Sequence, residues 1–263
     1  MRRTILTLVA SVVAVLALAF AAVAVTGSGD SSTVTRARLE RSLPQVFANV
    51  YADQARILGR TDITASALKP QAMCDKHGPD VADVGPGGDW ICLMSWTDPQ
   101  VPMPAEGYGK FELNVHSNDC FTAAGPTKLT GYLTITDKAG NEVTNPAFEF
   151  DGCFDPAGDN TATGNSFPSV LNVASTTLTP DPQGKFSLQL TCGTGSEGCT
   201  GQVAAAAGTV DLGTVPVALK EESTGRLTFP EALPPGTKEV VFTVTTTAGV
   251  GPSSPVTLSV APP

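Results

Sequence analysis

Apolar side chains in the stretch after residue 33 recur at spacings of three and four, which places them on one face of an amphipathic helix. The helix is expected over residues 43–58, with a capping box at Ser42 and Gln45 and an end at Gly59. Residues 33–42 form a candidate earlier helical piece, joined to it by a kink at Pro44. The apolar positions are Leu39, Leu43, Val46, Phe47, Val50, Tyr51, Ile57 and Leu58.

Beyond the helix the spacing of apolar positions shortens to two, as in half-buried strands. Phe111, Leu113 and Val115 alternate with polar residues, and the sequence "DKAGNE" has hairpin turn chemistry. One helix followed by about four antiparallel strands predicts a small α+β domain over residues 33–155. The expected strands are 89–97, 109–117, 131–143 and 147–153.

Residues 156–168 have no periodicity and are rich in Gly, Asn, Thr and Pro, so they are expected to be a linker. Short strand-like runs then recur between Gly and Pro turns. Their number and spacing predict an all-β Ig-like sandwich over residues 169–263. The seven runs lie near 170–178, 185–192, 200–206, 209–219, 225–231, 238–246 and 254–261.

The N-terminus carries Arg2 and Arg3 before an uncharged run of 23 residues, Thr4 to Thr26. This run exceeds the ~7–15 apolar residues of a cleavable signal peptide and reaches the ~20 that span a bilayer. Residues 1–30 are therefore expected to be a signal anchor, with the remainder of the chain outside the cytoplasm. The small-x-small sequence at residues 22–24 leaves a cleaved signal peptide, and hence secretion, as the alternative.

The formal net charge of −9 hides a gradient along the chain. Residues 31–60 carry five arginines and two acidic residues, a balance of +3, whereas residues 61–263 carry nine basic and 22 acidic residues, a balance of −13. The basic stretch suits anionic lipid head groups, and the acidic remainder repels phosphate backbones. The expected partners are the membrane, through the N-terminal helix, and an envelope protein or polysaccharide. Nucleic acid is not expected.

Six cysteines all follow the export segment, and an even number in an exported chain predicts disulfides. Sequential pairing is the simplest of the 15 possible connectivities. Each of the first two bonds would then staple the first domain, adding roughly 3 kcal/mol in the chain-entropy model. The cysteines are Cys74, Cys92, Cys120, Cys153, Cys192 and Cys199.

The stretch "CDKHGPDVADVGPGGDWIC" places four aspartates and His77 between Cys74 and Cys92. Zinc sites need four closely spaced Cys or His ligands, and calcium loops need regularly spaced acids with a closing Glu. Neither pattern is met, so no metal or cofactor is expected. A solvated acidic loop closed by a disulfide is favoured, and a weak, exposed calcium site is the lesser alternative.

Catalysis has few candidate residues in this chain. Only His77 and His116 supply an imidazole, and in "HSND" the neighbours on a strand would point to opposite faces. No Gly-x-Ser-x-Gly elbow is present. Carboxylate pairs such as Glu149 and Asp151 lack surrounding aromatic subsites, so they are interpreted as surface charge. No catalytic residue is therefore expected.

Aromatic residues gather in the first domain, where they can form a core or a binding platform. Trp90 and Trp96 are interpreted as core residues beside the helix. Tyr108, in the turn "AEGYG", is the residue most expected to contact a partner.

Two resemblances follow from these residues. The stretch from "GKFSLQLTCGTGSEGC" to "KEVVFTVTTTAG" resembles bacterial surface Ig-like domains, which implies that fold for about residues 170–263 but no antibody-like recognition loops. The segments "LPQVFANVYADQARILG" and "NPAFEFDGC" of the first domain resemble an uncharacterised actinobacterial family of membrane-anchored exported proteins. That resemblance implies a location and an architecture.

The expected function is that of a non-catalytic, extracytoplasmic cell-envelope protein, a protein- or glycan-binding or spacer module tethered to the membrane. The alternative is an extracytoplasmic enzyme, or an enzyme's accessory subunit, that acts on cell-wall polymers. A deep polar cleft would favour the enzyme, and a flat exposed patch would favour the binding module.

Overall fold

A computed structural model describes residues 33–76, 78 and 80–261. The expected membrane segment, residues 1–30, and His77 lie outside the described residues. Within the described part of the chain, no helix has the length and apolar character needed to cross a membrane. Contacts group the chain from Val34 onward into one unit, and this unit holds two separate large hydrophobic cores. The division into two domains at residues 156–168 stays a prediction.

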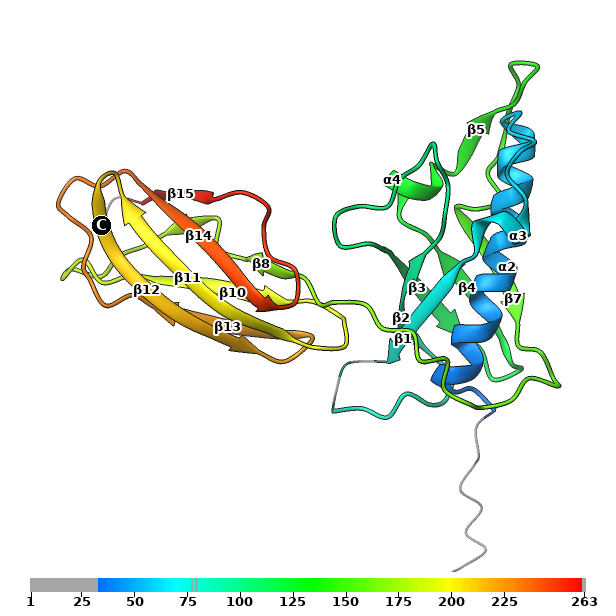
Figure 1. Cartoon of the computed structure of the whole chain (residues 1–263), viewed down its shortest axis with the longest axis horizontal. Coiled ribbons are helices and arrows are strands. Elements are labelled where there is room, and N and C mark those ends of the chain that lie inside the picture. The colour runs from blue at the N-terminus through cyan, green and yellow to red at the C-terminus, as the bar shows by residue number, and fades with distance from the viewer. Residues whose placement is uncertain (1–32, 77, 79, 262–263) are drawn as a thin grey trace, which may run out of the picture. The chain divides into compact units, whose positions relative to one another are not determined.

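The first core belongs to a helix–sheet region, residues 34–155, and the second to a sandwich region, residues 169–261 (Figure 1). The helix–sheet region contains α2 (Arg36–Ile57), α3 (Ala65–Leu68), β1 (Gln71–Lys76), β2 (Gly87–Ser95), β3 (Gly109–Val115), β4 (Cys120–Ala124), α4 (Thr127–Thr130), β5 (Thr134–Thr136), β6 (Glu142–Thr144) and β7 (Glu149–Cys153). The sandwich region contains β8 (Leu171–Val173), β9 (Thr177–Leu178), β10 (Ser187–Cys192), β11 (Cys199–Ala207), β12 (Val210–Leu219), β13 (Ser223–Thr228), β14 (Glu239–Ala248) and β15 (Val256–Val260).

The long helix α2 begins seven residues earlier than the helix predicted at 43–58. Its N-cap is Thr35, whose side chain accepts a hydrogen bond from the backbone N–H of Arg38, so the predicted cap at Ser42 was wrong. Pro44 lies inside the helix instead of in a first turn. Proline removes the N–H that would bond to the carbonyl of Glu40, but the apolar face continues through Leu39 and keeps both parts packed.

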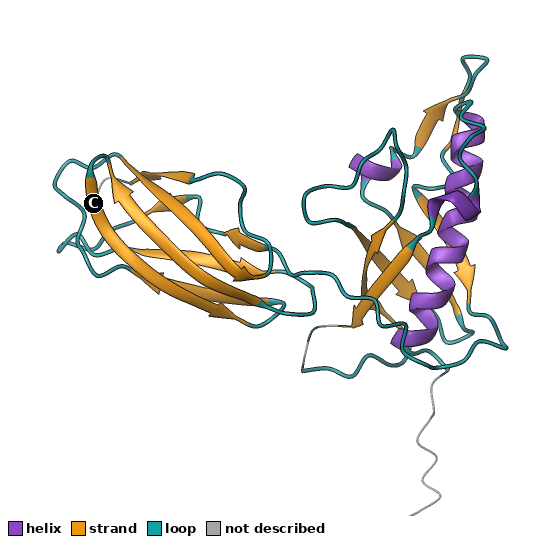
Figure 2. Cartoon of the chain, viewed as in Figure 1, coloured by secondary structure: helices purple, strands orange, loops and turns teal. Residues whose placement is uncertain are grey.

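The helix–sheet region has a five-stranded antiparallel sheet in the order β1-β2-β3-β4-β7 (Figure 2). Two of its strands, β1 and β4, were not predicted. The hairpin predicted within 131–143, with its turn at "DKAGNE", is confirmed as β5–β6, but it forms a separate two-stranded sheet and not a strand of the main one. In β1, four consecutive residues are buried, so the alternation that marks a half-buried strand is missing.

One face of the sheet packs against α2, as predicted. The ring of Phe47 lies 4.6 Å from that of Trp96 and 5.3 Å from that of Phe111, measured between centroids. Trp90 and Trp96 are both buried in this core, which confirms their interpretation as core residues. Aromatic pairs at such distances add to the free energy gained by burying their area.

The sandwich region has two sheets, one in the order β13-β10-β8 and the other in the order β12-β11-β14-β15-β9. Their inner faces share the second core, whose largest rings are Phe186, Phe229 and Phe242. The first predicted run, 170–178, is divided between the sheets, because β8 pairs with β10 while β9 pairs in parallel with β15. The local sequence pattern does not show this division, because the partner of each strand is set by contacts between segments distant in the chain.

Candidate functional site at the edge of the first sheet

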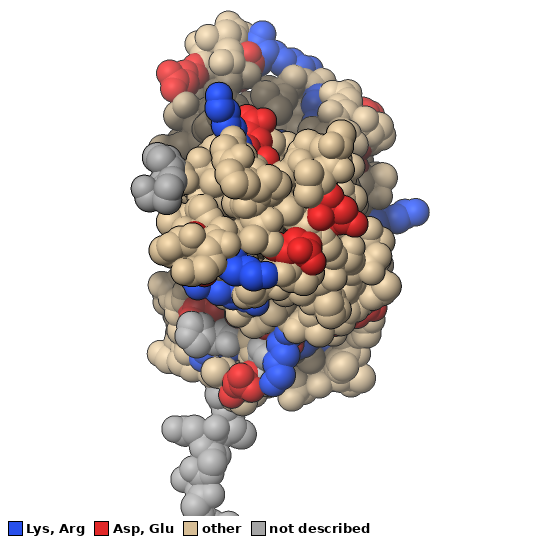
Figure 3. All heavy atoms as spheres, turned by 90° about the vertical axis from the view of Figure 1, so that its left-hand side faces the viewer, with Lys and Arg blue, Asp and Glu red and all other residues tan. Residues whose placement is uncertain are grey.

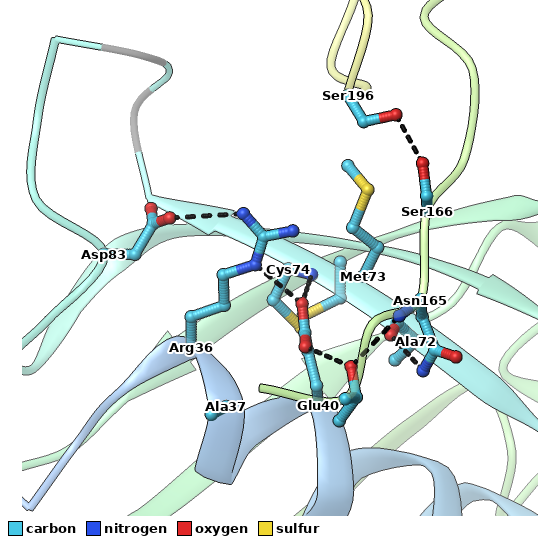
Figure 4. A network of polar contacts seen from close by, with 12 residues as sticks. Arg36, Ala37, Glu40, Ala72, Met73, Cys74, Asp83, Asn165, Ser166 and Ser196 are labelled. Atoms are coloured by element: carbon cyan, nitrogen blue, oxygen red, sulfur yellow. Dashed lines mark hydrogen bonds and ion pairs between the residues drawn. A yellow bond between two sulfur atoms is a disulfide. The ribbon is translucent and has the colours of Figure 1, made fainter. Parts of the chain in front are cut away.

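The edge strand β1 lies at the centre of a polar network that joins α2, the acidic loop and the linker (Figure 4). Its central group is the carboxylate of Glu40, a residue of α2 that is only 4% exposed. Glu40 Oε1 accepts hydrogen bonds from Arg36 Nε at 2.7 Å and from the backbone N–H of Cys74 at 3.0 Å. Glu40 Oε2 accepts one from Thr163 Oγ1 at 2.5 Å. A single buried carboxylate thus links three segments that are distant in sequence.

The free edge of β1 is closed by side chains. Because β1 pairs with β2 on one side only, alternate backbone groups point away from the sheet. The N–H of Cys74 donates to Glu40, the N–H of Lys76 donates to Asp83 Oδ1 at 2.8 Å, and the carbonyl of Ala72 accepts from Asn165 Nδ2 at 2.9 Å. Three outward-facing backbone groups of this edge are therefore occupied by side chains of the same chain.

Two of the four aspartates in the acidic stretch, Asp75 and Asp83, have structural partners. Asp75 is 7% exposed, and its Oδ1 accepts a hydrogen bond from the backbone N–H of Gly78. Burial raises the pKa of Asp75 above its ordinary value, and the bond from Gly78 opposes this rise. Asp83 lies 3.5 Å from Arg36 Nη1. These carboxylates hold the loop against β1 and α2.

A metal site needs three or more ligand side chains close together. Among residues 33–76, 78 and 80–261, no three His, Cys, Asp or Glu side chains are grouped so that they could hold a metal ion. The two cysteines that border the acidic loop are joined to each other, and the carboxylates of Asp75 and Asp83 accept hydrogen bonds from the backbone. The described residues therefore favour the disulfide clasp for this stretch.

All six cysteines form disulfides, in the sequential pairing Cys74–Cys92, Cys120–Cys153 and Cys192–Cys199. The first two each join directly opposed residues of neighbouring strands, with Cα atoms 4.0 and 3.8 Å apart. Both occupy pairs whose backbones are not bonded to each other, where antiparallel strands bring Cα atoms closest. The first bond is fully buried, whereas the second carries the exposed Cys153.

Tyr108 lies beneath the linker and is 6% exposed. Its hydroxyl donates a hydrogen bond to the carbonyl of Pro168 at 2.9 Å, and its ring lies 5.5 Å from that of Phe167. Burial, together with the charge of Glu106, raises the pKa of Tyr108 to about 12. Tyr108 thus contacts its own chain, on the sheet face that α2 does not cover, where it packs with Met73. Its role toward a partner stays a prediction.

His116 lies exposed in the turn between β3 and β4. Its backbone N–H donates to the carbonyl of Cys120, and Asp119 has a φ of 62° in the same turn. The "HSND" stretch therefore makes a tight turn, in which Asn118 Oδ1 accepts from the N–H of Cys120.

A buried ionic cluster escaped the sequence reasoning. The carboxylate of Asp98 has no exposed surface, accepts a hydrogen bond from the hydroxyl of Tyr51 at 2.7 Å and pairs with Arg60. Burial by itself raises the pKa of Asp98, but the bonds from Arg60, Tyr51 and the N–H of Gln100 outweigh it and lower the pKa. No spacing rule identifies this aspartate, because its partners come from α2 and from the turn after it.

The hollows of the described surface include one in each region. One, of about 450 Å³, lies on the outer sheet face and is lined by polar residues that include Glu112, Asn114, Thr122 and Glu149. The other, of about 570 Å³, lies in the sandwich region between the proline-rich loops 180–184 and 233–238. On the face drawn in Figure 3, basic and acidic side chains are scattered among uncharged residues, with no continuous patch of either sign.

Comparisons with known proteins give little further information. No family model matches the chain, and no curated protein matches it. A solved structure of a Ca²⁺-stabilized adhesin, which helps an Antarctic bacterium reach out and bind ice, shares 16% identity with it at a TM-score of 0.21. The match covers 75% of this chain and 45% of that chain. A likeness at this TM-score assigns neither a fold family nor a function.

Proposed function

We propose that this protein is a non-catalytic, exported cell-envelope protein that binds another envelope component, a protein or a polysaccharide, and holds it away from the membrane. The observation that carries the proposal is the complete pairing of six cysteines in three disulfides. Disulfides form and persist in oxidising compartments outside the cytoplasm. The tether in this proposal is the apolar N-terminal run, Thr4 to Thr26.

A non-catalytic role is supported by the use that the fold makes of its buried carboxylates. Glu40, Asp75 and Asp98 accept hydrogen bonds from backbone N–H groups, from arginines or from Tyr51. A catalytic acid or base needs a side chain directed at a substrate, whereas these three are engaged in joining helix, strand and loop.

We also propose that the sandwich region is Ig-like. Strands β8, β10 and β13 share one sheet, and β11, β14 and β15 belong to the other. This distribution agrees with the Ig pattern, in which strands A, B and E face strands C, F and G. Such modules serve in many surface proteins as spacers and as binding units, and they host unrelated functions.

Binding and catalysis on cell-wall polymers are distinguished by one experiment. The full chain in neutral detergent is mixed with purified peptidoglycan and centrifuged, and the supernatant is analysed by mass spectrometry for soluble fragments. Sedimentation without fragments supports a glycan-binding module, and a chain left in the supernatant without fragments directs the search to protein partners. Release of fragments that increases with time would contradict the proposal and support the enzyme. A reduced and alkylated chain is the matched control.

The tether is tested on cells that produce the full chain. We expect the chain in the membrane fraction, with an intact N-terminus by mass spectrometry and with its cysteines resistant to alkylation. A chain found in the cytosolic fraction with free thiols would contradict the export proposal.

A further inference from the structure

The second edge of the five-stranded sheet, β7, differs from β1 because its backbone is open. Phe154 N–H donates to Asp119 O at 2.8 Å, and Gly125 N–H donates to Phe148 O at 3.1 Å. With the register that pairs Glu149 with Ala124, residues 148, 150, 152 and 154 bond to β4. The N–H and C=O groups of Glu149, Asp151 and Cys153 therefore point away from the sheet.

This open stretch is bounded at both ends. The N–H of Ala147 donates to Asn145 Oδ1 at 3.0 Å, and the carbonyl of Asp155 accepts from Arg38 Nη2 at 2.9 Å. Between them, among the described residues, no group bonds to the outward backbone of Glu149, Asp151 or Cys153. Figure 1 draws β7 at the margin of the sheet beside α2. An unpaired edge of this kind is a template for a further strand.

The outer side of this edge is acidic. Glu149 and Asp151 are exposed on the face opposite α2, and Glu112 lies in the same cross-strand row as Glu149, with the small Ala124 between them. Asp151 accepts a hydrogen bond from Thr122 Oγ1 at 2.7 Å. None of the ion pairs found among the described residues involves these carboxylates.

The inner side of the edge carries an apolar side chain of α2. A Cβ atom added at Gly152 would lie 2.9 Å from Val46 Cγ2, which places the half-buried Val46 of α2 directly over β7. A strand added beside β7 would turn alternate side chains toward Val46 and the others toward Glu149 and Asp151. The two faces of such a strand therefore meet different chemistry.

We infer that the open edge of β7 binds an extended segment of another envelope protein, in which basic residues alternate with apolar ones. The backbone of that segment pairs with Glu149, Asp151 and Cys153, its basic side chains face the acidic outer surface, and its apolar side chains cover Val46. The inference deepens the proposed binding role by naming the surface and the kind of partner. It rests on that role.

The probe is a synthetic peptide of seven residues in which lysine alternates with valine, added to the full chain in neutral detergent. We expect the segment 147–155 to take up deuterium at least tenfold more slowly with the peptide bound, because outward N–H groups become hydrogen-bonded. A second peptide carries N-methyl groups at the positions that face β7. It keeps the charge but loses the backbone bonds, so its affinity should fall tenfold or more.

The contribution of the acidic side chains is tested by substitutions in the protein. Glu149→Lys should weaken binding of the lysine–valine peptide about fivefold, whereas Glu231→Lys, at an exposed loop position of the sandwich region, should change it less than twofold. Equal binding of the N-methylated peptide, protection of residues 72–76 in place of 147–155, or no protection at all would overturn the inference. These outcomes leave the peptidoglycan experiment unaffected, so failure here is distinguishable from failure of the proposed function.

Discussion

At the scale of single residues, the charged groups that matter most are those removed from water. Asp98, in the loop after β2, contacts Tyr51 of α2 and Arg60 of the turn that follows α2. Removal of only one partner of such a buried ion pair strongly destabilises a fold. Exposed pairs contribute little. The pair between Asp53 and Arg56, whose side chains are 61% and 69% exposed, is the natural comparison.

Asp98→Asn should lower the free energy of unfolding of the helix–sheet region by roughly 3 kcal/mol at pH 7, since it leaves the Arg60 charge without its partner. The pKa of Asp98 is lowered in the folded state, so its stabilisation is present above about pH 3.8 and is lost as the pH falls through the folded value. The variant should therefore lose less stability on acidification than the parent. Urea unfolding followed by tryptophan fluorescence measures this, because Trp90 and Trp96 both lie in the first core.

Asp53→Asn is the control for this experiment and should change the free energy of unfolding by less than about 0.5 kcal/mol. An equal loss in both variants would contradict the role given to the buried cluster.

Alkaline titration tests the burial of Tyr51 and Tyr108. Burial and the bond to Asp98 raise the pKa of Tyr51 to about 12, and burial raises that of Tyr108 to about 12 as well. The stabilisation that each neutral tyrosine provides is complete below about pH 10 and is lost as the pH rises toward 12. Phenolate absorbance should show two of the three tyrosines ionising near pH 12. Tyr51→Phe should remove one of these two, and a phenolate at Tyr51 already formed near pH 10 would contradict its burial.

At the scale of elements, the two edges of the first sheet receive opposite treatment. Side chains from α2, the acidic loop and the linker close β1, whereas the middle of β7 keeps its backbone open. Proteins protect exposed edges because an unpaired strand pairs readily with other chains. The sheet therefore has one edge that is protected, at β1, and one that is available for pairing, at β7.

Glu40→Ala tests the closed edge. The substitution leaves the buried N–H of Cys74 without an acceptor, and a group orphaned in this way costs about 1–3 kcal/mol. Glu40→Gln retains one acceptor oxygen and should cost about half as much. The free energy of unfolding is measured by tryptophan fluorescence in urea, and deuterium uptake of residues 72–76 should rise in Glu40→Ala. Unchanged uptake there would show that Glu40 does not close the edge.

The elements were predictable where burial on one side leaves a regular pattern. The apolar stripe of α2 and the alternation in β3 are of this kind, and both were predicted. The pattern failed for β1, whose four central residues are all buried, and for residues 131–133, whose apolar side chains Tyr132 and Leu133 are exposed. Prediction from such patterns assumes that a strand has one buried face and one exposed face, and that apolar residues occupy the buried one. In β1 both faces are buried, whereas at residues 132–133 the apolar side chains are exposed.

At the scale of the whole molecule, the disulfides differ in access to solvent. Cys74 and Cys92 are both fully buried, Cys192 and Cys199 are almost so, and Cys153 is exposed. Thiol–disulfide exchange requires a thiolate to reach a sulfur atom. Solvent access to the sulfur atoms therefore sets the order in which the three disulfides of the folded protein are reduced.

Limiting dithiothreitol under native conditions should reduce Cys120–Cys153 before the other two bonds. Quenching with an alkylating agent and mapping the peptides by mass spectrometry gives the order, with the urea-unfolded chain as the control in which the preference disappears. Early reduction of Cys74–Cys92 would mean that the closed edge of β1 opens in the native state.

The sequence by itself determined the classes of structure and the location expected of them. Periodicity predicted a helix packed on an antiparallel sheet and a second part built of short strands, and six cysteines after an apolar run predicted disulfides outside the cytoplasm. These properties follow from the local spacing of apolar residues and from the number of cysteines. Tertiary structure alone decided which charged residues are buried, as with Glu40 and Asp98, and which backbone edge stays open at β7. Burial and edge pairing arise from contacts between segments far apart in the chain, so no local pattern records them.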